Sequence, residues 1–188
     1  MANKEAVGMI ELTSIGIGHV VQDAMLKAAS VKLLAGRSIC SGKYIVIVGG
    51  QVGPVQSAMR AGLDAAPDGV IDQILIPNIH PDVFAALGDM VQLSVRNEQI
   101  PSLGIVETFS AASALEAADA AAKAADVTLF RIHIAMAMGG KGLVMMSGSV
   151  SDCHTAVEAA AAVVKEKGLL VSKVTIPRPS RELFAERI

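Results

Sequence analysis

Two cysteines, Cys40 and Cys153, carry the most reactive side chains in this sequence. Cys40 precedes the turn pair Ser41-Gly42, whereas Cys153 lies in an apolar helical pattern, where cysteine behaves as a small hydrophobic residue. Thiolates are the usual ligands of iron–sulfur clusters and also bind zinc, but such sites take three or four donors. One cysteine is most simply a small loop residue, so a metal site at Cys40 needs several copies of the chain.

The other reactive side chains form no catalytic constellation in the sequence. Glu11 and Glu107 recur at equivalent places, but paired catalytic carboxylates must face one site across a few ångströms. We therefore expect both to be structural. The four histidines lack metal-ligand spacing, and the glycine-rich stretches lack both the P-loop and the dinucleotide-binding patterns. These observations predict a protein that is not an enzyme.

The composition favours a protein that packs closely against other subunits. Hydrophobic residues make up 52% of the chain, but aromatic residues only 3%. The net charge of −2 argues against the basic face of a nucleic-acid binder. The sequence shows neither an apolar run of membrane-spanning length nor a secretory signal, and its low cysteine content fits a reducing cytosol. We expect a cytoplasmic protein that contacts neither nucleic acid nor membrane.

The chain contains the same unit twice, and internal repeats decide the fold. The offset between matching segments grows from 96 to 100 residues, which requires only short insertions. The matching pairs are Val7–Ser14 with Leu103–Ser110, Asp23–Ala29 with Asp119–Ala125, Gly42-Lys43 with Gly140-Lys141, and Ile76-Pro77 with Ile176-Pro177.

Each unit is predicted to fold as strand, helix, strand, strand, helix, strand. In the first unit the strands are expected at 7–13, 31–39, 43–48 and 70–76. Leu26 faces away from the apolar side of the first helix, where we expect a contact between subunits. The apolar stripes are formed by Ile17, Val20, Val21, Ala24, Met25 and Ala28 in the first helix, by Val52, Val55, Met59 and Leu63 in the second, and by Val150, Cys153, Val157, Ala161 and Val164 in the second helix of unit two.

This element order predicts an α+β protein of two tandem ferredoxin-like domains, each β-α-β-β-α-β. Helices would cover one face of an antiparallel sheet in each domain. The more polar stretch between the units is expected to be a linker. The predicted boundaries are 1–83 for the first domain, 84–101 for the linker and 102–188 for the second domain.

These segments resemble the bacterial microcompartment (BMC) shell domain over about residues 6–183. That family has a first strand of Gly-Ile-Ile-Glu-Thr type, matched at Gly8–Leu12 and Gly104–Thr108. Its Asp-x-x-x-Lys-Ala-Ala helix, Gly-Lys pore turn and closing Ile-Pro segment correspond to the repeated pairs above. Two unpermuted domains in series resemble the tandem trimeric class of shell proteins. One departure is Ser41, where the resemblance leads us to expect proline.

The resemblance implies a homotrimer whose six domains form a pseudohexamer around a central opening, a closed symmetry common among homo-oligomers. Lys27, Lys123 and Arg178 would then lie at the edges where neighbouring shell tiles meet. The residues implied to line the pore are Ser38, Ile39, Cys40, Ser41 and Gly42 from the first unit, and Met136, Ala137, Met138, Gly139 and Gly140 from the second.

Only one of the two loops contains a cysteine, so a trimer would bring three thiols to the axis. The resemblance to cysteine-bearing members of the class implies one 4Fe-4S cluster per trimer, ligated by Cys40 of three chains. It also implies electron transfer or cluster supply across the shell, with other shell proteins and enclosed redox enzymes as partners. Three alternatives stay open. They are a zinc site with three cysteines and water, a tile that passes a metabolite, and a soluble ferredoxin-like ligand-binding regulator.

Overall fold

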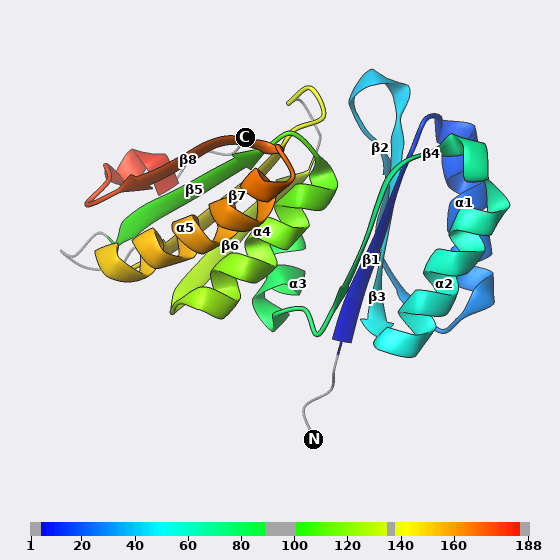
Figure 1. Ribbon diagram of the computed structural model, residues 1–188, viewed down its shortest axis with the longest axis horizontal. Coiled ribbons are helices and arrows are strands. Elements are labelled where there is room, and N and C mark those ends of the chain that lie inside the picture. Colours follow the sequence, from blue (N-terminus) through cyan, green and yellow to red (C-terminus); the bar gives the residue numbers. More distant parts are fainter. Residues whose placement is uncertain (1–4, 89–100, 135–137, 185–188) are drawn as a thin grey trace. The chain divides into compact units, whose positions relative to one another are not determined.

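The computed structural model describes residues 5–88, 101–134 and 138–184. The chain forms two compact units, one built mainly on the residues up to Ile79 and the other on the residues from His80 onward. Each unit holds a four-stranded antiparallel sheet with two long helices on one face (Figure 1).

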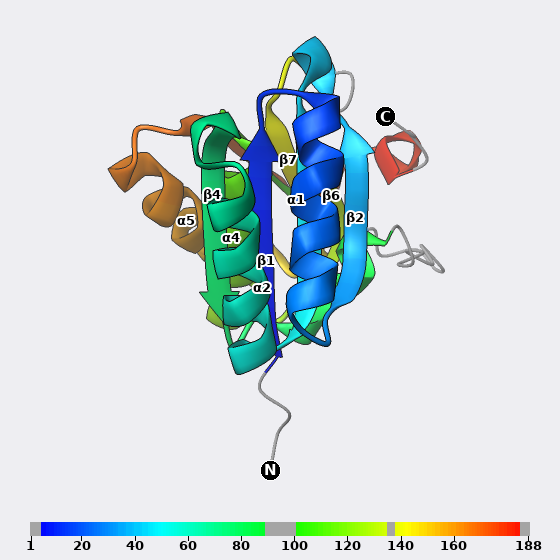
Figure 2. The same ribbon diagram turned by 90° about the vertical axis from the view of Figure 1, so that its right-hand side faces the viewer.

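The first unit contains the predicted sequence of elements. Its sheet has the order β2-β3-β1-β4, in which every neighbouring pair is antiparallel, and Figure 2 shows α1 and α2 side by side over it. The elements are β1 (Glu5–Leu12), α1 (Ile15–Ala28), β2 (Lys32–Ser38), the 3₁₀ turn η1 (Cys40–Gly42), β3 (Tyr44–Gln51), α2 (Val52–Ala65), η2 (Pro67–Gly69) and β4 (Val70–Pro77).

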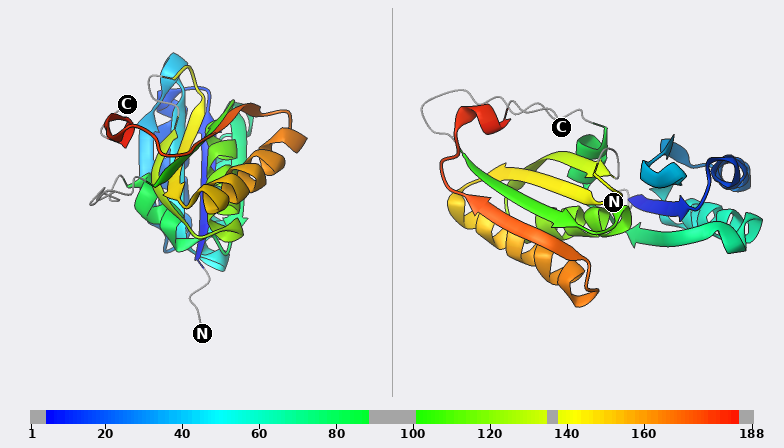
Figure 3. Two further views of the ribbon diagram at one scale, coloured as in Figure 1. Left: turned by 90° about the vertical axis from the view of Figure 1, so that its left-hand side faces the viewer. Right: turned by 90° about the horizontal axis from the view of Figure 1, so that it is seen from above.

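The second unit repeats this topology with the sheet order β6-β7-β5-β8. Figure 3 shows α5 lying along this sheet. The elements are α3 (Pro81–Leu87), β5 (Ser102–Thr108), α4 (Ala111–Ala124), β6 (Val127–Ile134), β7 (Gly142–Gly148), α5 (Val150–Glu166), β8 (Leu170–Ile176) and η3 (Arg181–Phe184). The α+β class and the duplicated ferredoxin-like order are confirmed.

The first helix of each unit begins in the same way, because a serine follows each first strand. The Ser14 hydroxyl accepts the N–H of Ile17 at 3.3 Å, and the Ser110 hydroxyl accepts the N–H of Ser113 at 3.1 Å. A serine in this position satisfies a helix N–H group that otherwise has no partner. The duplication therefore extends to the helix caps.

The glycine of each first strand allows a helix to approach the sheet closely. A Cβ added at Gly8 would lie 2.6 Å from the sulfur of Met59 on α2, and one at Gly104 would lie 2.8 Å from Cγ2 of Val157 on α5. Such distances are too short for van der Waals contact, so any side chain at either position would separate the layers. This explains the repeated glycine of the first-strand motif in terms of packing.

The predicted apolar stripes are mostly correct, but three of their members, Val20, Ala28 and Val150, are exposed. Val21 and Met25 are fully buried, whereas Val20 is 57% exposed. Val20 lies about 100° around the helix from Val21, outside the arc that faces the sheet. Val150 is 51% exposed because it is the first residue of α5, and the buried stripe begins at Cys153.

The structure gives further detail at the expected domain boundaries. α3 spans the expected junction at residue 83, and residues 89–100 of the expected linker lie outside the described residues. The boundaries 1–83, 84–101 and 102–188 stay a prediction. Among the helices of the described ranges, none is both long and apolar enough to cross a membrane.

Candidate pore loops and shell-edge residues

Cys40 lies at the tip of the hairpin that joins β2 to β3. The N–H of Ile39 donates to the Lys43 carbonyl at 2.9 Å and closes the turn at its base. Cys40 is half-buried, and Ser41 and Gly42 are exposed. Ser38 is exposed at the end of β2, whereas Ile39 is 7% exposed and belongs to the core. The accessible tip of the hairpin is therefore formed by Cys40, Ser41 and Gly42.

The backbone of this turn explains the absence of proline. Ser41 has φ 65° and ψ 26°, and Gly42 has φ 72°. Proline is restricted to φ near −65°, so it cannot occupy position 41 in this conformation. The proline expected there from the resemblance is therefore incompatible with this loop. A serine held in the left-handed region costs on the order of 1 kcal/mol.

A buried ion pair ties the base of this loop to the first strand. The Lys43 ammonium lies 2.9 Å from Oε1 of Glu11, whose side chain is only 5% exposed. Burying a carboxylate is unfavourable unless a charged or hydrogen-bonding partner is present. Glu11 is therefore a structural residue that fixes the Gly-Lys turn, as the sequence predicted.

The same ion pair recurs in the second unit. The Lys141 ammonium lies 2.9 Å from Oε1 of Glu107, and the Ser172 hydroxyl donates to the other carboxylate oxygen at 3.2 Å. Glu107 is 27% exposed, so water reaches this pair more readily. The sequence contained evidence for both pairs, because glutamate and lysine recur together in the two repeats.

The second loop differs from the first in its side chains. Met136 and Ala137 lie outside the described residues. Met138 is half-buried, and Gly139 and Gly140 have φ of 63° and 88°. The described part of this loop therefore contains two consecutive glycines in the left-handed region and no cysteine, histidine or carboxylate.

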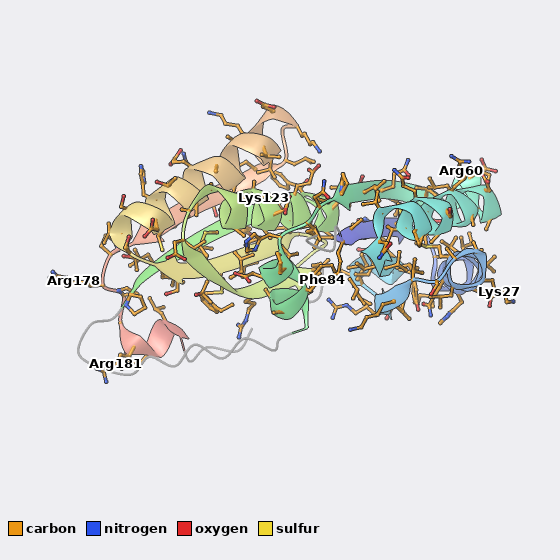
Figure 4. All side chains as sticks on the ribbon, turned by 90° about the horizontal axis from the view of Figure 1, so that it is seen from below. Lys27, Arg60, Phe84, Lys123, Arg178 and Arg181 are labelled. Atoms are coloured by element: carbon orange, nitrogen blue, oxygen red, sulfur yellow. The ribbon has the colours of Figure 1, made fainter. Side chains whose placement is uncertain are left out.

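The predicted edge residues lie on helix ends and turns. Lys27 pairs with Asp23, and Lys123 with Asp119, both at 2.6 Å and both one helical turn apart. The side chain of Lys27 is 74% exposed. Figure 4 shows Lys27 on α1 and Lys123 on α4.

Arg178 follows β8 in a turn that recurs in the first unit. Arg178 is exposed (Figure 4). Its backbone has φ 51°, and its counterpart Asn78 has φ 54°. Arg178 and both edge lysines are therefore accessible within the single chain.

Cys153 is a core residue, as predicted. It is fully buried, and its Sγ donates to the Ser102 carbonyl at 3.5 Å. Burial raises the pKa of the Cys153 thiol above its ordinary value. The neutral thiol is therefore the stable form, and it neither reacts nor binds metal readily.

The described residues of one chain hold no group of three or more histidine, cysteine, aspartate or glutamate side chains that could bind a metal ion. His19 instead contacts the Tyr44 ring, with the ring centroids 4.9 Å apart. Among the described residues, Cys40 therefore belongs to no metal-binding group within one chain. A half-buried thiol at a hairpin tip fits a site shared between copies of the chain.

A groove of about 610 Å³ lies between α2 and β4 of the first unit. Its walls include Met59, Leu63 and Leu75, with Arg60 and Asp64 at its polar side. Its lining contains neither cysteine nor histidine.

The chain belongs to the BMC domain family, whose model matches residues 6–79 and 102–179. It is a shell protein with two such domains in series. It is 42% identical over 184 residues to the bacterial microcompartment shell protein PduT of Citrobacter freundii, and the alignment covers 98% of both chains.

Two further similarities agree with the duplication. The carboxysome shell protein CsoS1 of Prochlorococcus marinus is 41% identical over 96 residues, which cover 47% of this chain but 92% of that protein. The crystal structure of a microcompartments protein from Desulfitobacterium hafniense superimposes with a TM-score of 0.90 at 44% identity, covering 95% of this chain and 97% of that one.

Proposed function

We propose that this protein is a structural tile of a bacterial microcompartment shell in the cytoplasm, and that three copies form a pseudohexamer. The full-length similarity to a microcompartment shell protein supports the shell role. Because each chain supplies two equivalent domains, three chains supply the six positions of a closed ring. Lys27, Lys123 and Arg178 are exposed, as contacts to neighbouring shell proteins require.

We further propose that three Cys40 thiols meet at the axis of this trimer and hold one 4Fe-4S cluster. The observation that carries this proposal is the hairpin tip, where Cys40 is presented by one loop only, beside the exposed Ser41 and Gly42. Three protein thiolates leave one iron for a ligand from solvent or a small molecule.

The bound cluster would supply one-electron chemistry at the shell. The contribution of the chain is positional, because the Lys43–Glu11 ion pair and the Ile39–Lys43 hydrogen bond hold the Cys40 turn in place. Enzymes enclosed in the compartment would be the redox partners. This role is structural and electron-transferring rather than catalytic.

Metal analysis of anaerobically purified protein tests the cluster. The proposal expects brown protein with about four iron atoms and four sulfides per three chains, and an electron-paramagnetic-resonance signal after reduction. Cys40→Ser should abolish iron binding and leave the trimer intact. Cys153→Val is the matched control, because the first unit has Val55 at the equivalent position, and it should keep the iron.

Other outcomes of this experiment separate the alternatives. Colourless protein with one zinc per three chains would replace the cluster by a zinc site. Metal-free trimers after anaerobic reconstitution would leave a tile whose opening passes a metabolite. Electron microscopy of overproduced protein tests the tile itself, because shell tiles form sheets or tubes and a soluble ligand-binding regulator stays dispersed.

A further inference from the structure

The turn and short helix that follow the last strand also occur twice in this chain. Asn78 and Arg178 both adopt a left-handed backbone, with φ of 54° and 51°. His80 then caps α3 by accepting the Asp82 N–H, and the Ser180 hydroxyl donates to the Glu182 carboxylate at the start of η3. The sequences 77–85 and 177–185 share a leading proline and an ending in phenylalanine and alanine. The repeat therefore extends beyond the sheet.

The first copy of this segment is docked on a helix of the second unit. α3 packs against β6 and α4, and its Val83 and Ala86 are fully buried. The N–H of His80 donates to Oδ1 of Asp119 at 2.8 Å. The other Asp119 oxygen accepts the Lys123 ammonium at 2.6 Å, and the carboxylate is only 12% exposed.

The first unit has an equivalent helix, α1, but the aspartate on this helix is exposed to solvent. Asp23 on α1 is the counterpart of Asp119 and pairs with Lys27 at the same 2.6 Å. Its side chain is 61% exposed, and within the described part of the chain its Oδ1 accepts no hydrogen bond. Ile15, on the same helix, is 44% exposed, whereas its counterpart Ala111 is fully buried.

In the second copy of this segment, which includes η3, the described side chains are also accessible to solvent. Arg181 and Glu182 are exposed and Leu183 is half-buried, whereas Val83, the counterpart of Leu183, is fully buried. The described residues of one chain thus expose both a receiving helix, α1, and a second copy of the segment that docks on such a helix, so two copies of the chain are complementary to each other.

We infer that the segment 179–184 of one chain docks on α1 of a second copy, as α3 docks on α4 within one chain. The N–H of Ser180 then donates to Oδ1 of Asp23 of the partner subunit. A hydrogen bond from a backbone N–H to a carboxylate is charge-assisted and among the stronger ones. The contact is head-to-tail, and such contacts close into a ring when the rotation is suitable. This inference rests on the proposed trimer and names the surfaces that hold it together.

Sedimentation velocity across a dilution series tests this contact. Asp23→Ala should weaken association by about tenfold for each contact, hence by roughly 10³ in the overall dissociation constant of the trimer. Deleting residues 180–188, which removes the segment but no strand, should give monomers. Fluorescence of Tyr44, the single tyrosine of the chain, verifies that the first unit stays folded in both variants.

Two variants serve as matched controls. Lys27→Ala removes the ion pair on α1 but keeps the Asp23 acceptor, so the trimer should keep its affinity. Asp119→Ala should lower the melting temperature of the second unit without dissociating the trimer. If the Asp23→Ala trimer is as tight as the Lys27→Ala trimer, the inference is overturned while the trimeric tile stands. A monomeric wild-type protein would instead refute the proposed tile.

Discussion

The two Gly-Lys turns predict that removing Lys43 destabilises the protein more than removing Lys141. Both lysines bind a first-strand glutamate at 2.9 Å, and methionine preserves most of the volume of the lysine side chain. The two ion pairs differ in their access to water. Lys43→Met and Lys141→Met therefore form a matched pair of variants within one chain.

The expected loss of stability in each variant follows from how deeply its ion pair is buried. Removing one partner of a buried ion pair costs about 3–5 kcal/mol. Glu11 is 5% exposed but Lys43 is 33% exposed, so solvent screening reduces the expected cost of Lys43→Met to about 2–3 kcal/mol. Glu107 is 27% exposed and keeps the Ser172 hydroxyl as a donor, so Lys141→Met should cost about 1 kcal/mol or less.

Denaturation of both variants at equal protein concentration measures this difference, because association also raises apparent stability. For a chain of this size the melting temperature should fall by about 5–10 °C for Lys43→Met and by about 2–4 °C for Lys141→Met. Circular dichroism follows both units, and Tyr44 fluorescence reports on the first unit alone. Equal shifts, or a larger shift for Lys141→Met, would refute the burial argument.

Three further predictions concern the turn, the buried thiol and helix packing. Ser41→Gly should raise the free energy of unfolding by roughly 1 kcal/mol in urea denaturation, whereas Ser41→Pro should lower it, because φ at this residue is 65°. The Cys153 thiol should resist alkylation in the folded protein. Because its folded pKa is raised, its contribution to stability is complete below the ordinary thiol pKa and falls as pH rises toward the folded value, and Cys153→Val should remove this part of the pH dependence. Gly18→Ala should cost about 1–3 kcal/mol, since its Cβ would lie 2.3 Å from the Tyr44 ring, whereas Gly16→Ala, which meets no atom within 4 Å, should be neutral or stabilising in the same assay.

Most of the fold was predictable because two copies of one pattern support each other. A helical stripe such as Val55 and Met59 is ambiguous alone, but its recurrence as Cys153 and Val157 fixes the period. The errors at Val20, Ala28 and Val150 have one cause. Periodicity gives the direction of a side chain, whereas burial also depends on where the helix meets the sheet.

The site was less predictable, since it depends on backbone conformation. The left-handed Ser41 has no sequence signature, and the resemblance suggested a proline that this turn excludes. The Lys43–Glu11 pair could have been found, because both residues recur at equivalent positions. The repeated docking segment after β4 was missed, since a turn and a short helix carry little hydrophobic periodicity.

The account depends most on three Cys40 residues gathering at a single point in the assembly. A nitroxide spin label attached to Cys40 of the metal-free protein, in a Cys153→Val background, tests this directly. We expect strong dipolar broadening of the electron-paramagnetic-resonance spectrum, which disappears when labelled chains are diluted into excess Cys40→Ser protein. Sharp, uncoupled lines in the undiluted, fully labelled assembly would contradict the convergence of the thiols.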